Sequence, residues 1–298
     1  MPNTLAHFGV EGLVIRRLLR GSDLKWIYVS CIIPDLPWIF QRVAHVAIPR
    51  IDPFDLRLYV TVQASLFFSL ILGAALSMFS VNTWRTLSIL SMGATLHLIM
   101  DALQTKWGNG VHLFAPFDWT LWNAGLFWPE DFPTLALTGF GLLYFLNHLK
   151  RTMTEPVDFL VPRGRKLLLM AGLLVAYFAG PLLMTQFAEH SDSHYVKILR
   201  EKQLRIGRYI EIDRANYKIT ESGGKLEIFS GEKLDLVGVE LNHPASISVR
   251  GRFVGENRIN VEAWHLHSIN RDYATYLGLS LLATVWIVGL FRQYIDRK

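Results

Sequence analysis

Residues 84–104 read WRTLSILSMGATLHLIMDALQ, and this stretch decides the class of protein to which the chain belongs. Coiled as an α-helix, it is long enough to cross the roughly 30 Å of hydrocarbon in a bilayer. His97 and Asp101 lie near its far end. Charged side chains at membrane depth are costly, and where they occur they usually serve a function. The stretch therefore predicts a membrane-spanning helix with a polar site at one end.

Similar apolar stretches occur at residues 59–79, 132–149, 167–187 and 273–291. The stretch 24–46 is also apolar, but Pro34, Asp35 and Pro37 interrupt it. Because proline kinks a helix, we expect a broken or re-entrant helix there, with an amphipathic helix on the membrane surface as the alternative. The composition agrees, since 18% of the residues are charged, against about 25% in soluble proteins. We expect a mainly α fold, a polytopic transmembrane helical bundle.

Basic residues indicate how this bundle lies in the membrane, because short loops rich in Lys and Arg stay in the cytoplasm. Such residues flank several spans, namely Arg16, Arg17, Arg20, Lys25, Arg85, Lys150, Arg151, Arg163, Arg165, Lys166, Arg292, Arg297 and Lys298. All fall on one side if residues 24–46 cross once, which predicts cytoplasmic N- and C-termini. Arg50, Arg57 and Lys106 fall on the other side. The basic loops explain the formal charge of +5 without a nucleic-acid partner.

The segment 188–272 has a different character, because polar and apolar residues alternate in it, as in Arg208-Tyr209-Ile210-Glu211-Ile212. The alternation and the turn residues between the runs predict about five short strands. A small β-barrel or sandwich is expected, with an OB-like barrel as one candidate. The chain then divides into a helical membrane domain at 1–187, an extracytoplasmic β-rich domain at 188–272, and a last span with a cytoplasmic tail at 273–298.

The polar residues of the spans point to a metal site. His97 and Asp101 are four positions apart and so share one helix face. Imidazole and carboxylate suit zinc, manganese or iron, and the alternative is a hydrogen bond that joins helices. Asp35 lies at the break in the first apolar stretch, where its alternative role is to cap a half-helix.

Other histidines extend the candidate set. His7 precedes an amphipathic stretch, and the alternative is an ordinary surface or core histidine. His112 follows a glycine-rich segment, and the alternative is an interfacial turn rich in aromatic residues. His265 and His267 share one strand face, as a second metal site or simply a pair at the end of a strand. The only cysteine is Cys31, which excludes a cysteine-rich zinc site and a disulfide within the chain.

Four sequence elements together carry a resemblance: Thr4-Leu5-Ala6-His7-Phe8-Gly9, Pro34-Asp35, His97-x-x-x-Asp101 and Gly110-x-x-x-Phe114-x-Pro116-Phe117. In this order they resemble the membrane-bound, metal-dependent hydrolase family of bacterial inner membranes, also described as LexA-binding inner-membrane-associated putative hydrolases. The resemblance covers roughly residues 1–150. It implies a multi-pass inner-membrane protein, and the segment 188–272, which the basic residues place outside the cytoplasm, is then expected to be periplasmic.

The resemblance implies His7, Asp35, His97 and Asp101 as metal ligands, with His112 as a further candidate. Whichever of Asp35 and Asp101 is not a ligand is the candidate general base. The expected cofactor is a divalent ion, zinc first and manganese or iron as alternatives. Held by these residues, it would lower the pKa of bound water toward about 7.

The chain departs from the family pattern on the span that follows the Pro-Asp element. Gln63 and Ser65 stand where the family carries histidines. Gln63 would act as a ligand or hydrogen-bond one, and His45 is a substitute ligand. The departure leaves open whether the chain is catalytic.

Three functions follow from these patterns. The first is hydrolysis of an ester or phosphoester in a lipid or envelope substrate, at the extracytoplasmic face of the membrane. The second is a non-catalytic membrane scaffold that binds a protein partner and keeps the fold. The third is a proton- or ion-coupled transporter, because intramembrane His and Asp also relay protons. The polar residues gather near one face and not along a path, which favours the first two.

Overall fold

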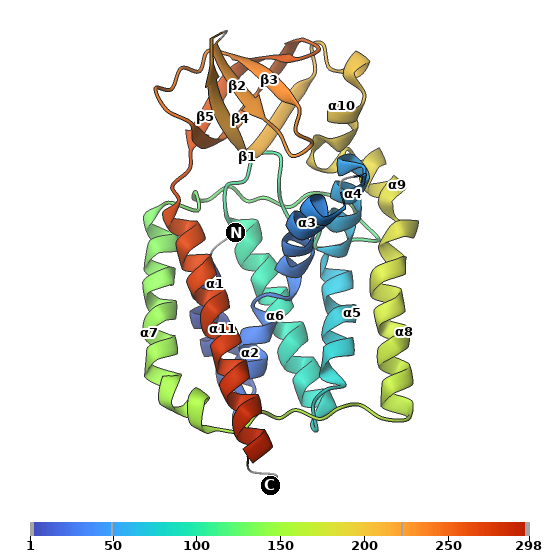
Figure 1. Cartoon of the computed structure of the whole chain (residues 1–298), viewed down its shortest axis with the longest axis vertical. Coiled ribbons are helices and arrows are strands. Elements are labelled where there is room, and N and C mark those ends of the chain that lie inside the picture. Colours follow the sequence, from blue (N-terminus) through green and yellow to red (C-terminus); the bar gives the residue numbers. More distant parts are fainter. Residues whose placement is uncertain (1–2, 49, 222, 296–298) are drawn as a thin grey trace.

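The computed structural model describes residues 3–48, 50–221 and 223–295. A helical bundle forms most of the molecule, and a small five-stranded sheet domain covers one end of it, inserted before the last helix (Figure 1). This confirms the mainly helical fold with a β domain. The long helices run along the long axis, between the barrel and the end that carries the described C-terminal residues.

Three helical stretches in the described residues are long and apolar enough to cross a membrane. They are α6 (Thr83–Leu103), the stretch Arg165–His190 and α11 (Asn270–Ile295). The second consists of α8 (Arg165–Ala179), a short turn η2 (Gly180–Leu183) and α9 (Thr185–His190). A fourth candidate is a broken one, in which α4 (Pro53–Gln63) and α5 (Leu66–Ser77) meet at 69°. The expected span at 59–79 is thus bent near its start.

The first apolar stretch is broken at its prolines. α2 (Leu24–Ser30) ends before a 3-10 turn, η1 (Ile33–Asp35), and α3 (Leu36–Ala47) follows directly. Pro34 and Pro37 each stand near the start of a new helical segment, where the missing N–H costs nothing. The break places Asp35 inside the bundle.

α1 (Thr4–Leu18) lies inside the bundle against α7 (Phe132–Thr154). A Cβ on Gly141 would lie 1.7 Å from the Leu5 carbonyl oxygen, so only glycine allows this approach. Asn3 caps α1 by accepting a hydrogen bond from the Ala6 N–H (3.1 Å), while its amide donates to Thr138 of α7 (2.6 Å). These contacts hold α1 in the interior.

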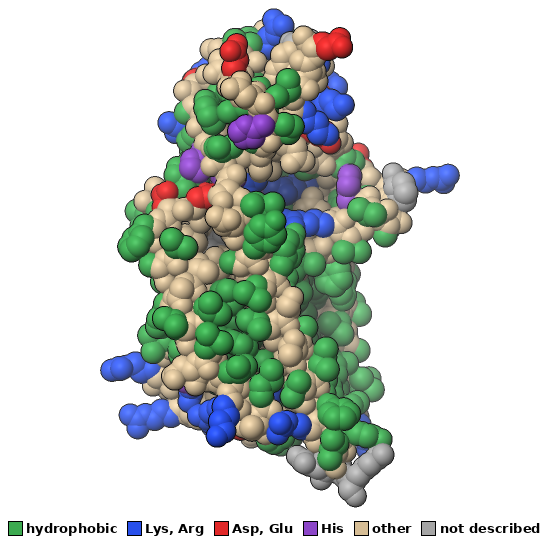
Figure 2. All heavy atoms as spheres, turned by 60° about the vertical axis from the view of Figure 1, so that its left-hand side comes forward, with side chains coloured by type: hydrophobic (Ala, Val, Ile, Leu, Met, Phe, Trp, Pro, Cys, Tyr) green, Lys and Arg blue, Asp and Glu red, His purple; other side chains and the backbone are tan. Residues whose placement is uncertain are grey.

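The position of α1 corrects one expectation. Its first described residue, Asn3, lies toward the barrel end, and Ile295 lies at the opposite end (Figure 1). The basic residues predict both termini on one side, with the N-terminal residues before the first span. Instead, α1 is itself an additional helix of the bundle. Its sequence does not read as a span because its buried face carries the polar residues Thr4, His7 and Glu11. Arg16 and Arg17 still lie at the end opposite the barrel, where Lys and Arg side chains gather (Figure 2).

The sheet domain is a closed barrel with strand order β1-β2-β3-β5-β4. Its strands are β1 (Tyr209–Thr220), β2 (Gly223–Glu227), β3 (Lys233–Val237), β4 (Ala245–Gly255) and β5 (Arg258–Leu266). Neighbours are antiparallel except β3 and β5. Alternate side chains fill the interior, among them Ile210, Leu226, Leu234, Val249 and Ile259. Short helical turns, η3 (Ser193–Tyr195), α10 (Val196–Arg200) and η4 (Lys202–Leu204), connect α9 to the barrel.

Candidate metal centre

Two helices of the bundle each carry an acidic residue four positions after a histidine. α1 carries His7 and Glu11, and α6 carries His97 and Asp101. Residues at this spacing share one helix face. α1 runs away from the barrel and α6 runs toward it (Figure 1). In this antiparallel pair, each histidine faces the acid of the other helix.

The side chains meet in what we call the central cluster: His7, Glu11, Asp35, His97 and Asp101. Across the helices, His7 Nε2 lies 3.8 Å from Asp101 Oδ1, and His97 Nδ1 lies 3.7 Å from Glu11 Oε1. Asp35 Oδ1 adds a third carboxylate 3.5 Å from His97 Nε2. The structure thus brings together four residues that the sequence singled out and adds Glu11.

The central cluster is buried and its ligand atoms are unsatisfied. The side chains of His7, Glu11 and His97 are 0% exposed and that of Asp101 is 1% exposed. Both ring nitrogens of His7 and His97 and the Oδ1 atom of Asp101 make no hydrogen bond, whereas Asp101 Oδ2 has the Lys106 ammonium 3.2 Å away. Buried polar atoms in folded proteins almost always have partners, because an unpaired one costs about 1–3 kcal/mol.

The donor set fits a divalent cation. Imidazole nitrogen and carboxylate oxygen are the ligands that zinc, manganese and iron take in proteins. The ligand atoms of His7, His97 and Asp101 lie within 4.8 Å of one another, so this group could hold a metal ion. A bound cation would supply the partner that the buried nitrogen and oxygen atoms lack.

Glu11 is oriented by α2. Its Oε2 accepts a hydrogen bond of 2.8 Å from the Ser30 hydroxyl, which leaves Oε1 facing the imidazole rings. Gly93, one turn before His97 on α6, makes room for this pair. A Cβ on Gly93 would lie 1.9 Å from Ser30 Oγ and 2.8 Å from Glu11 Oε2.

Four predicted residues lie outside the central cluster. The Gln63 amide donates to Tyr59 Oη and to the Tyr177 carbonyl oxygen, each at 3.2 Å. Ser65 is buried at the start of α5, and His45 lies on α3 beside a cavity described below. His112 is buried against Trp119, with ring centroids 5.7 Å apart. Burial lowers the pKa of His112 to about 4.

Sequence reasoning missed two residues of the site. Glu11 has the same spacing from His7 that Asp101 has from His97, and this repeat was the available signal. The distribution of basic residues places Lys106 on the side opposite the cytoplasm and predicts no role for it. Its ammonium lies 3.2 Å from Asp101 Oδ2 and is buried, so it offsets part of the negative charge.

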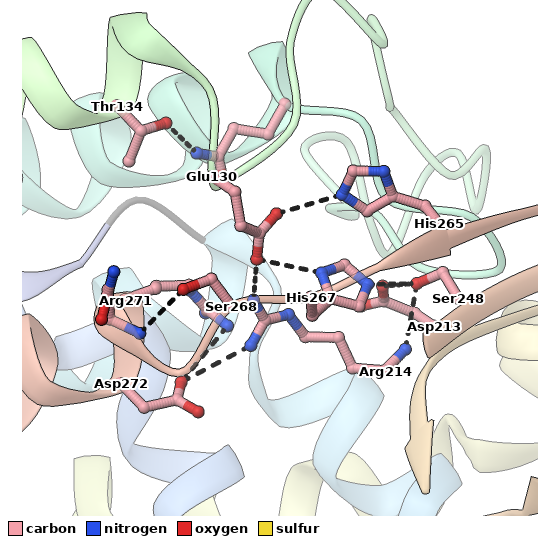
Figure 3. Close-up of polar contacts among 12 residues, drawn as sticks. Glu130, Thr134, Asp213, Arg214, Ser248, His265, His267, Ser268, Arg271 and Asp272 are labelled. Atoms are coloured by element: carbon pink, nitrogen blue, oxygen red, sulfur yellow. Dashed lines mark hydrogen bonds and ion pairs between the residues drawn. The ribbon is translucent and has the colours of Figure 1, made fainter. Parts of the chain in front are cut away.

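A second polar group joins the barrel to the bundle, and Figure 3 shows it as a connected network. Glu130, just before α7, lies 3.0 Å from His267 Nδ1 through Oε1 and 3.4 Å from His265 Nε2 through Oε2. Arg214 of β1 also binds Glu130. His267 Nε2 continues to the Ser248 hydroxyl at 2.7 Å. These residues form the junction network.

The junction network has its own charge balance. The group Glu130, His265 and His267 could hold a metal ion by its spacing. Arg214, however, already supplies a positive charge to Glu130. Burial raises the pKa of Glu130, but the hydrogen bond and charge of His267 and the charge of Arg214 outweigh it and hold the pKa at about 2.

A cavity of about 490 Å³ lies between the bundle and the barrel, and we call it the junction cavity. Asp101 and Lys106 line it on the bundle side, and Asp213 and Arg214 line it on the barrel side. Asp101 thus belongs to both the central cluster and the cavity wall. No family model, curated protein or solved structure matches this chain. The resemblance to the hydrolase family therefore stays a prediction.

Proposed function

We propose that the chain is a membrane-bound, metal-dependent hydrolase whose active site is the central cluster. The observation that carries this proposal is the set of buried His and Asp atoms without hydrogen-bond partners. A divalent ion there would lower the pKa of a bound water molecule and polarise the substrate oxygen. Zinc is the first candidate, with manganese or iron as alternatives.

The residues take different roles in this proposal. His7, His97 and Asp101 are the proposed ligands, because one donor atom from each lies within 4.8 Å of the other two. Asp35 is the most exposed member, at 17% of its side chain. It is therefore the proposed general base, since a base must exchange its proton with solvent. Lys106 offsets the charge of Asp101.

The proposed substrate is an ester or phosphoester of a lipid or envelope component. The cavity beside Asp101 supports this, because it lies at the barrel end of the bundle, where the membrane-spanning helices end. The basic residues at the opposite end support a cytoplasmic location for that end and an outer, periplasmic one for the barrel. The barrel, whose strand order fits an OB-like fold, would cover the site and the cavity beside it.

Metal content tests the proposal directly. The protein is purified in detergent, and its metals are measured by inductively coupled plasma mass spectrometry. We expect a stoichiometric divalent ion in the parent protein and its loss in His97→Ala and His7→Ala. His45→Ala is the matched control, because His45 lines the cavity outside the central cluster. Equal metal content in His97→Ala and the parent protein would refute the proposed site.

Hydrolysis is then tested on short-chain phosphate and carboxylate esters. We expect activity that disappears with a chelator, returns with zinc or manganese, and is absent in Asp35→Asn with its metal retained. A metal-loaded protein with no activity on any ester class would favour a scaffold that has kept the fold.

A further inference from the structure

The junction cavity has a basic wall made by two helices. On α3, four side chains at helical spacing line it: Trp38, Gln41, Arg42 and His45. On α4, Arg57 projects into the same space. Figure 2 shows basic side chains at the recess between the barrel and the helices.

Arg57 has no carboxylate within ion-pair distance among the described residues. Its guanidinium makes two long contacts, 3.5 Å to Gln41 Oε1 and 3.4 Å to His194 Nδ1. Its Nε is buried without a partner. The rings of Trp38 and Phe229 stand 4.6 Å and 5.2 Å from the guanidinium carbon. Aromatic contacts leave the N–H edge of a guanidinium free to bind an anion.

The carboxylates of the cavity wall are already engaged. Asp101 pairs with Lys106 and Glu227 with Lys218. Asp213 accepts a hydrogen bond from the Ser248 hydroxyl at 2.8 Å, and Glu211 accepts one from the Gly108 N–H at 2.7 Å. Asp213 acts on Arg57 through space, but beyond ion-pair distance. Arg57 is half-buried, and its buried Nε has no partner. A guanidinium withdrawn from water without a carboxylate partner is costly, so Arg57 is expected to serve an anionic ligand.

The outer face of α3 indicates how that ligand enters. Phe40, Val43 and Val46 are 56%, 58% and 82% exposed, and they alternate with the residues that face the cavity. Such an amphipathic helix lies at a membrane surface with its apolar face in the acyl region. One face of α3 therefore contacts lipid while the other lines a basic cavity.

We propose that the junction cavity binds the phosphate-bearing headgroup of an amphiphile, with the phosphate on Arg57 and Arg42. Arginine binds phosphate with two parallel N–H donors, and Arg57 would exchange only its two long contacts to Gln41 and His194 for them. The acyl chains would pass along α3 into the bilayer. The proposal deepens the proposed function, since it places a phospholipid-like substrate beside Asp101, but it concerns binding and does not require hydrolysis.

Binding to detergent-solubilised protein tests this proposal, with dihexanoyl phosphatidic acid, dihexanoylglycerol and inorganic phosphate as probes. Isothermal titration is run on the protein as purified and again with EDTA. We expect tight binding of the phosphatidic acid, and at least tenfold weaker binding of the neutral lipid and of inorganic phosphate. Because this experiment measures affinity, it can support the binding proposal even if the protein holds no metal or hydrolyses no ester.

Variants assign the site. Arg57→Gln is expected to weaken phosphatidic acid binding at least tenfold, and Arg57→Lys less. Arg42→Gln, on an exposed position that cannot disturb packing, should weaken it several-fold. Arg17→Gln, exposed at the opposite end of the bundle, is the matched control and should leave affinity unchanged. The proposal fails if Arg57→Gln and Arg42→Gln both bind like the parent protein. It also fails if the neutral lipid or inorganic phosphate binds as tightly as phosphatidic acid.

Discussion

The imidazole rings of His7 and His97 stack, with their centroids 3.8 Å apart and their planes inclined by 9°. They come from two antiparallel helices, and each ring has an acid of the other helix beside it. Two charged rings at this distance would repel each other strongly. The two rings are therefore not both protonated in this arrangement, and the neutral imidazole is the form that binds metal.

Metal removal should destabilise the protein. An ion that binds only the folded state at one hundred times its Kd contributes about 2.7 kcal/mol. We expect a chelator to lower the Tm of the parent protein and to leave the Tm of His97→Ala almost unchanged, because the variant has little metal to lose. Differential scanning fluorimetry in detergent measures both. An identical drop in the two proteins would mean that the chelator acts elsewhere.

Gly93→Ala should damage the central cluster through its contacts with Ser30 and Glu11. The new Cβ would lie 2.2 Å from Ser30 Cβ, so α2 and α6 must separate. Overpacking of this kind costs about 1–3 kcal/mol, and Glu11 would lose its orienting contact. Metal content and Tm should both fall. Gly172→Ala on α8 is the control, because no atom lies within 4 Å of its added Cβ. Full metal content in Gly93→Ala would show that Ser30 and Glu11 are not needed.

The junction network predicts a pH dependence. The ordinary pKa of Glu130, 4.5, falls to about 2 in the fold. A depressed pKa stabilises the fold fully above 4.5, and this contribution is lost as the pH falls from 4.5 toward 2. We expect the Tm of the parent protein to drop over this range. The Tm of Glu130→Gln should be lower at neutral pH and should change less as the pH falls. Glu256→Gln, exposed on the barrel, should follow the parent. A parent-like slope in Glu130→Gln would exclude Glu130 as its source.

The path of α1 predicts where an N-terminal tag lies. α1 begins at the barrel end and runs away from it (Figure 1). With the barrel outside, a protease added to intact spheroplasts should remove an N-terminal tag and spare a C-terminal one. A cysteine introduced at Arg208 of the barrel reports the outer side independently, since Arg208 is exposed and Cys31 is buried. Protection of both tags would contradict the observed path.

The sequence by itself determined the mainly helical fold, several helices long and apolar enough to cross a membrane, the β domain before the last helix, and the position of His97 and Asp101 on one helix face. These features are local, because hydrophobic runs, alternation and four-residue spacing each express the geometry of a single element. The break at Pro34 is local for the same reason, since proline removes one backbone donor wherever it stands.

Only the tertiary structure decided which polar residues meet. His7 reaches His97 because Gly141 lets α1 pack into the bundle against α7, and no local pattern encodes that approach. His112 stays outside the central cluster because its loop packs on Trp119 instead. Arg57 lies on a cavity wall only because the barrel covers that end of the bundle. Contacts between distant elements depend on how their surfaces fit together in three dimensions, and that fit is a property of the whole fold.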